Sequence, residues 1–263
     1  MWRNKKVSLA FPTYREKDSM FAAIMDAVNT DIIDEVLVIN NNAEPGTSEE
    51  VARAQKAAAE VKPSCVIREV TEPIQGYGAA CMRGLDEAQG DYVLLSEPDG
   101  TFTANDVYKL VAYADDYGIV FGSRTVKEFI WSGANMWWFL RWGNWFVAKM
   151  LELLFNTNSL TDVGCTMRLI KREELSTMRE YLTIRGSFFG PQMLLVAALL
   201  QLKFVQIPVN YRSRVGVSSV TGSFWKAFYL GCQMITLIFE YRFGKLYHGP
   251  DFLSKRKKVG LLR

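Results

Sequence analysis

Between positions 90 and 100 the chain reads Gly90-Asp91-Tyr92-Val93-Leu94-Leu95-Ser96-Glu97-Pro98-Asp99-Gly100, an apolar run that ends in two carboxylates one residue apart. The run predicts a buried strand that carries Glu97 and Asp99 to the loop at its carboxyl end. Hard divalent cations prefer such oxygen ligands and often share their site with substrate phosphates. A metal held there would act as a Lewis acid on a leaving nucleoside diphosphate. Taken alone, the four residues 97–100 also fit a simple turn, because Pro, Asp and Gly favour turns.

Further apolar runs on both sides of this strand predict a mostly parallel α/β sheet. They cover 7–11, 35–39, 65–70 and 118–121, and Pro12 is expected to end the first of them. Helical patterns lie between the strands, at 18–28, 47–61, 76–88 and 105–113. In such sheets ligands bind beyond the carboxyl ends of the strands. Polar residues follow those ends in Pro12-Thr13-Tyr14, Asn40-Asn41-Asn42, Glu97-Pro98-Asp99 and Gly122-Ser123-Arg124.

The composition is that of a folded, weakly basic protein. Of the 263 residues 49% are hydrophobic and 22% are charged, and the net charge is +3. This charge is too small for the basic surface of a nucleic-acid-binding protein, so no nucleic-acid partner is expected. The four cysteines form no CxxC pair and His248 is the single histidine, which favours a reducing compartment over a disulfide framework or a structural zinc site. No signal peptide precedes the first strand, and we expect a cytoplasmic protein.

Two segments predict peripheral attachment to the cytoplasmic face of a membrane. No run of about 20 apolar residues is present, as a spanning helix would require. Residues 129–156 and 221–246 are expected to form amphipathic helices that lie in the interface, the first because it contains five tryptophans. Ordinary core packing or a dimer interface is the alternative. The basic cluster Lys255-Arg256-Lys257-Lys258 is either a solvated tail or a further contact with anionic lipid.

The order of motifs along residues 7–220 resembles that of family 2 glycosyltransferases. The first strand with Pro12-Thr13-Tyr14-Arg15-Glu16 is similar to the opening motif of that family, and Gln75-Gly76-Tyr77-Gly78-Ala79-Ala80 resembles its glycine-rich helix before the DXD strand. Gly122-Ser123-Arg124 and the segments 161–168 and 211–219 follow in the family's order. The resemblance is strongest to the dolichyl-phosphate mannose synthase-like branch, whose members glycosylate polyprenyl phosphates.

This resemblance implies a GT-A fold and an inverting, metal-dependent glycosyltransferase that uses a UDP- or GDP-linked sugar. Mg²⁺ or Mn²⁺ is the implied cofactor, with Glu97 and Asp99 as its ligands. The implied catalytic residues are Asp99, Arg124 and Asp162, the last beside the donor sugar. The nucleotide-sugar site would contain Pro12, Tyr14, Glu16, Asn41, Gln75, Gly76, Glu97 and Asp99. Gly76 would contribute backbone shape and a tight turn, with no direct chemistry.

A lipid phosphate is expected as the acceptor. Gln192 stands where many relatives carry an acid, and glutamine cannot act as the base that an alcohol acceptor needs. A phosphate monoester is already anionic near neutral pH and needs positive charge instead, which arginine supplies well. The residues expected to bind the acceptor are Arg124, Arg141, Gln192, Arg212, Arg214 and Ser218. Asp162 acting as a base for an alcohol remains the alternative.

Two departures from the family pattern leave other functions open. Asn40 and Asn41 stand where the branch usually has two aspartates, which leaves the nucleotide base undecided, and Glu97 replaces the first aspartate of the DXD motif. The alternatives are a soluble or glycan alcohol acceptor, a sugar-phosphate nucleotidyltransferase, and a membrane-binding relative without activity. We expect a GT-A domain over 1–220, with a nucleotide-sugar half (1–100) and an acceptor half (101–220), followed by a membrane-associating segment (221–263). A homo-oligomer is compatible with these features.

Overall fold

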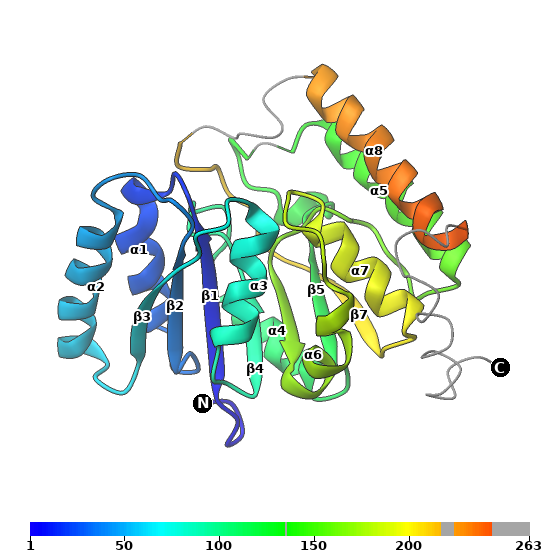
Figure 1. Cartoon of the computed structure of the whole chain (residues 1–263). Helices are drawn as coiled ribbons and strands as arrows, with labels where there is room; N and C mark the ends of the chain where they lie inside the picture. The colour runs from blue at the N-terminus through cyan, green and yellow to red at the C-terminus, as the bar shows by residue number, and fades with distance from the viewer. Residues whose placement is uncertain (135, 217–223, 244–263) are drawn as a thin grey trace.

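The computed structural model describes residues 1–134, 136–216 and 224–243. A sheet with the strand order β3-β2-β1-β4-β6-β5-β7 runs through the molecule (Figure 1). Its strands are β1 (Val7–Thr13), β2 (Glu35–Asn40), β3 (Val66–Thr71), β4 (Tyr92–Leu95), β5 (Ile119–Ser123), β6 (Arg168–Lys171) and β7 (Phe204–Pro208). Strand β6 is antiparallel to both of its neighbours, and the other pairs are parallel. The mostly parallel sheet is thus confirmed.

Helices cover both faces of this sheet. On one face lie α1 (Lys17–Val28), α2 (Thr47–Val61) and α4 (Asp106–Ala114), whose buried side chains share a core with the apolar residues of β1 and β2 that point the same way. On the other face lie α3 (Tyr77–Glu87), α6 (Arg172–Met178) and α7 (Phe189–Leu199). Strand residues alternate between the two cores, as the two-residue period of a strand requires.

A pair of helices lies beyond the carboxyl edge of the sheet. Helices α5 (Trp138–Phe155) and α8 (Phe224–Phe243) pack side by side above α7 (Figure 1). The helix expected at 129–156 therefore begins later, because residues 127–129 form a 3₁₀ turn and Trp131 donates a backbone hydrogen bond to Tyr211. The 221–246 prediction agrees with α8 over 224–243; its other residues and the basic cluster 255–258 lie outside the described residues. Among the described helices, none is long and apolar enough to cross a membrane.

The five strands and four helices predicted between residues 7 and 121 are all present, with one correction. Pro12 does not end the first strand, because β1 continues through it to Thr13. The backbone N–H and C=O groups of the even-numbered residues of β1 point toward β4, and Ala10 O accepts a hydrogen bond from the Ser96 N–H. Strand β4 ends at Leu95. The missing N–H of Pro12 therefore points beyond the end of its neighbour, where no ladder hydrogen bond is lost.

Candidate active site

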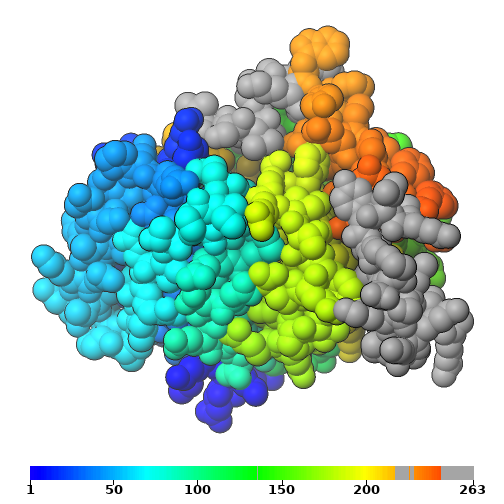
Figure 2. Space-filling model, in the orientation of Figure 1, coloured from blue at the N-terminus to red at the C-terminus, as the bar shows by residue number. Residues whose placement is uncertain are grey.

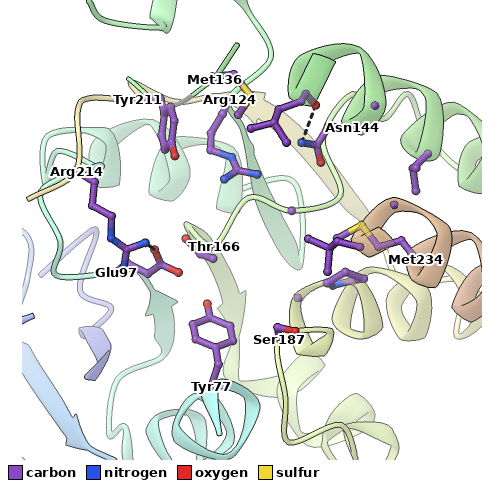
Figure 3. Close-up of a pocket in the computed structure, with 18 of the residues that line it drawn as sticks. Tyr77, Glu97, Arg124, Met136, Asn144, Thr166, Ser187, Tyr211, Arg214 and Met234 are labelled. Atoms are coloured by element: carbon purple, nitrogen blue, oxygen red, sulfur yellow. Dashed lines mark hydrogen bonds and ion pairs between the residues drawn. The ribbon is translucent and has the colours of Figure 1, made fainter. Parts of the chain in front are cut away.

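A cavity of about 610 Å³ opens at the carboxyl edge of the sheet, beneath α5 and α8 (Figure 3). Its floor is polar and comes from the loops that follow the strands. These lining residues include Pro12, Thr13, Tyr14, Glu16, Asn41, Gln75, Tyr77, Glu97, Thr166, Ser187 and Arg214. Its roof is apolar and comes from α5, α8 and Met136 before α5. One continuous cavity therefore contains both a charged region and an apolar region.

The acidic centre, Glu97 in the cavity wall with Asp99 buried behind it, stands at the end of β4, where the sequence predicted it. Asp99 is fully buried, and its Oδ1 accepts hydrogen bonds from the Thr101 backbone N–H at 2.9 Å and the Thr101 hydroxyl at 2.5 Å. Its Oδ2 accepts no hydrogen bond from the described residues. Glu97 lines the cavity next to it. Burial, together with the neighbouring Asp99 carboxylate, raises the pKa of Glu97 to about 8.

Arg214 extends into this acidic centre from the far end of the chain (Figure 3). Its Nε lies 3.1 Å from Asp99 Oδ2, one terminal nitrogen lies 3.2 Å from Glu16 Oε1, and the other lies 3.9 Å from Glu97 Oε2. Two backbone hydrogen bonds hold this segment in place, from Arg212 to Thr101 O and from Val215 to Asp99 O, both 2.8 Å. Arg214 therefore supplies positive charge beside three acidic side chains.

Arg124 supplies positive charge between the acidic centre and the apolar roof. It follows β5, lines the cavity and lies with its guanidinium carbon 5.3 Å from the Tyr211 ring centroid. Asp162 holds it from behind by accepting hydrogen bonds from Arg124 Nε (2.9 Å), Nη2 (3.0 Å) and its backbone N–H (2.9 Å). This bidentate geometry orients the guanidinium plane.

Asp162, predicted to lie beside the donor sugar, does not line the cavity and stands behind Arg124. Its side chain is fully buried, and the Gly164 backbone N–H donates a fourth hydrogen bond to it at 2.9 Å. Burial alone would raise the pKa of Asp162, but the charge and hydrogen bonds of Arg124 outweigh burial and lower it. The carboxylate is thus ionised and fully engaged, so its role is to position Arg124.

The end of the cavity where the sequence predicted a nucleoside is built from the loops after β1 and β2. Asn41 is buried and donates to Glu72 O (2.8 Å) and Ile74 O (2.7 Å), while its Oδ1 accepts from the Gly76 backbone N–H (2.8 Å). Its side chain therefore shapes the loop that presents Gln75, whose amide also lines the cavity. Gly76 has φ +147°, and an added Cβ would collide with the carbonyl of Arg185, which agrees with a backbone role for this glycine.

Gln192, expected to bind the acceptor, instead lies in the core and does not line the cavity. It is fully buried in α7, and its Oε1 accepts hydrogen bonds from the backbone N–H groups of Thr183 (3.0 Å) and Ile184 (2.8 Å). Its Nε2 lies 2.6 Å from the Tyr241 hydroxyl of α8 and 3.2 Å from Tyr181 O. Gln192 therefore connects α7 to α8 instead of binding an acceptor.

Of the other residues expected to bind the acceptor, some line the cavity and some do not. Arg124 and Arg214 line the cavity, whereas Arg141 and Arg212 do not. Arg141 donates to Thr125 O at 2.7 Å, and the Arg212 guanidinium lies 4.5 Å from the Trp131 ring centroid. Ser218 lies outside the described residues.

Sequence reasoning assigned no role to several polar residues that the fold brings into the cavity. Tyr77 points toward the Glu97 side of the cavity, with Thr166 and Ser187 near it (Figure 3). Tyr77 and Thr166 both belong to motifs that carried the family resemblance, so their position within those motifs was the available signal. Ser187 has no such signal, because it stands in the loop before α7.

Comparisons with known proteins agree with this architecture. A family profile, glycosyl transferase family 2, matches residues 8–178. The chain is 24% identical over 260 residues to the dolichyl-phosphate beta-glucosyltransferase of Mus musculus, covering 91% of this chain and 77% of that protein. It is 26% identical over 179 residues to the undecaprenyl-phosphate 4-deoxy-4-formamido-L-arabinose transferase of Serratia proteamaculans, covering 66% of this chain and only about half (51%) of that one.

Solved structures show the same fold. Glucosyl-3-phosphoglycerate synthase from Mycobacterium tuberculosis, in complex with Mn²⁺, UDP and glucosyl-3-phosphoglycerate, superposes with a TM-score of 0.65 at 14% identity, covering 91% of this chain and 80% of that one. The same enzyme with Mg²⁺ and UDP gives a TM-score of 0.62 at 15% identity, with the same coverage. This likeness identifies the GT-A fold.

Proposed function

The chain belongs to glycosyltransferase family 2, and from this premise we propose that it transfers a sugar from a nucleoside-diphosphate donor to a polyprenyl-phosphate-type acceptor at a membrane surface. The observation that carries the proposal is the single cavity of about 610 Å³ in which a polar, charged floor meets an apolar roof. Relatives named for dolichyl phosphate and undecaprenyl phosphate support the choice of acceptor.

The donor would bind across the polar floor. Tyr14 offers a stacking surface for a nucleoside beside Gln75, whose loop Asn41 holds in place, and Glu97 lines the cavity where the diphosphate would lie, with Asp99 buried behind it. The residues present fit a divalent cation, Mg²⁺ or Mn²⁺, which would take the place of the Arg214 guanidinium: Asp99 Oδ2 is a buried oxygen that accepts no hydrogen bond from the described residues and is ion-paired with Arg214 at 3.1 Å, and Glu97 is next to it. When bound, the cation supplies positive charge to the leaving diphosphate.

The acceptor phosphate would bind at Arg124, which Asp162 holds in a fixed orientation. Among the described residues that line the cavity, the only carboxylates are Glu16 and Glu97, and both lie near Arg214. An alcohol would need one of these carboxylates as its base, whereas a phosphate oxygen is already anionic and needs none. This oxygen attacks the anomeric carbon as the bond from that carbon to the diphosphate breaks. A single displacement of this kind inverts the configuration.

Attachment to the membrane would involve the outer sides of α5 and α8. Trp138 and Trp225 are 69% and 75% exposed, and Trp142, Trp145 and Tyr229 are also exposed. In Figure 2, α8 (orange) forms an outer rim of the molecule beyond α7 (yellow). Exposed tryptophans on such helices favour an interfacial position. Together with four free cysteines, they support a peripheral protein at the cytoplasmic face, with the segment from residue 221 contributing to attachment.

The test compares acceptors with one cognate donor found by screening UDP- and GDP-sugars with Mn²⁺. Purified protein in detergent or vesicles is given polyprenyl phosphate, the matching polyprenyl alcohol, or soluble sugars, and the glycosylated product is quantified. We expect transfer to the phosphate and loss of most activity in Asp99→Ala, by on the order of a thousandfold. Efficient transfer to the alcohol, or full activity of Asp99→Ala in EDTA, would contradict the proposal.

A further inference from the structure

The apolar roof of the cavity is formed by one face of α5 and one face of α8. On α5 the lining residues include Leu140, Gly143, Asn144 and Val147, flanked by Phe139 and Phe146, and on α8 they include Phe228, Gly231, Cys232 and Ile235, flanked by Leu230 and Met234. Both sets follow the spacing i, i+3, i+4, i+7, which places each set on one side of its helix. Each helix therefore carries a glycine at the same place in its cavity-lining face.

Nothing in the described structure requires glycine at these two positions. A Cβ added to Gly143 or Gly231 would meet no described atom within 4 Å. The glycines of α3 differ, because a Cβ at Gly78 would collide with the carbonyl of Ile184 and one at Gly84 would lie 2.8 Å from the Ala10 Cβ. Close helix packing thus explains the glycines of α3 and does not explain those of α5 and α8.

Glycine in a helix interior is less favourable than alanine. The two glycines in the wall of this cavity leave a volume empty that any side chain would fill. The space also lies in the right place for an acceptor chain. A Cβ added to Gly164 would lie 2.9 Å from Arg124 Nη2 and 3.3 Å from Asn144 Oδ1, so the guanidinium and Asn144 flank the same point. Gly143 directly precedes Asn144 on α5 and lines the same cavity as Arg124, so a chain attached to a phosphate at Arg124 would pass it.

We infer that Gly143 and Gly231 determine acceptor specificity by leaving a passage between α5 and α8 for the first isoprene units of the lipid chain. This inference rests on the proposed function, because it assigns the lipid part of the same acceptor. Isoprenoid chains carry a methyl branch on every unit, and they need a wider passage than a linear chain. Met234 lines the same passage and supplies a flexible wall.

The experiment measures kcat/KM for undecaprenyl phosphate and for the single-isoprene dimethylallyl phosphate in wild type, Gly143→Leu, Gly231→Leu and Gly231→Ala. We expect Gly231→Leu to lower the ratio of the long-chain to the short-chain value by about tenfold or more, as steric exclusion of part of a chain does. Thr236→Leu is the control, because it places the same leucine on α8 at an exposed residue outside the cavity. It should keep the wild-type ratio.

The melting temperature separates this result from misfolding. Gly231→Ala should melt higher than wild type while its ratio falls by a smaller factor, and this combination supports the inference even if the leucine variants fold poorly. Unchanged ratios in folded Gly143→Leu and Gly231→Leu would overturn the inference and leave the proposed function standing. A wild-type protein that glycosylates neither phosphate would overturn both.

Discussion

Asp162→Asn tests whether this carboxylate positions Arg124 or acts as a base. Asp162 is fully buried and accepts four hydrogen bonds, three of them from Arg124. An asparagine keeps one acceptor oxygen, and its amide group would face a guanidinium that is itself only 14% exposed. Breaking one partner of a buried ion pair costs about 3–5 kcal/mol, because the remaining charge stays desolvated.

For a protein of this size each kcal/mol shifts the melting temperature by roughly 2–4 °C, so we expect a decrease on the order of 10 °C. The folded-state pKa of Asp162 is lowered, so the stability that the ion pair contributes is present at neutral pH and is lost as the pH falls through that pKa. Thermal melts at pH 7 and at acidic pH should therefore show a smaller difference between wild type and Asp162→Asn in acid.

The kinetic assay measures transfer to a lipid phosphate at saturating donor. A misoriented Arg124 should lower kcat/KM by on the order of a hundredfold, since small displacements of a positioning group have effects of this size. Arg124→Gln should lower kcat/KM by at least as much. The double variant Asp162→Asn, Arg124→Gln should then be only slightly slower than Arg124→Gln alone. Fully additive effects of Asp162→Asn and Arg124→Gln on the rate would refute the positioning role. It would also be refuted if Asp162→Asn lost only the acid limb of the pH–rate profile and kept the wild-type stability.

Three further predictions concern the acidic centre and the core. Arg214→Gln should bind Mn²⁺ more tightly than wild type in the absence of donor, by about tenfold, because a guanidinium no longer competes among Glu16, Glu97 and Asp99; equal affinities in a calorimetric titration would contradict this. Since the pKa of Glu97 is raised to about 8, the native state holds an extra proton between the ordinary carboxyl pKa and that value. Stability should consequently decline as the pH rises toward 8, while Mn²⁺ affinity increases, and Glu97→Gln should flatten the stability profile. Gln192→Glu should destabilise the fold by about 2–4 kcal/mol in urea titrations, because a carboxylate cannot donate to Tyr181 O, yet KM for the acceptor should stay near the wild-type value.

Much of the fold and the acidic centre could be derived from the sequence, because the determining features are local. The buried strands of a parallel sheet are short apolar runs, and their carboxyl ends coincide at one edge whatever the strand order. Glu97 and Asp99 follow such a run directly, so their place at the site required no knowledge of the rest of the chain. The tryptophans around α5 likewise indicated an exposed aromatic surface from composition alone.

Only the tertiary structure decided which distant side chains meet. Strand β6 inserts antiparallel between β4 and β5, and nothing in the four residues Arg168–Lys171 specifies that position. Arg214 meets Asp99, and Asp162 meets Arg124, through segments that return from far along the chain. Gln192 was misassigned because sequence position shows that α7 is apolar but does not show which neighbours surround its one amide. The physical reason is the same in each case: the sequence determines local periodicity and burial, whereas the partners of a buried polar group depend on how remote segments pack around it.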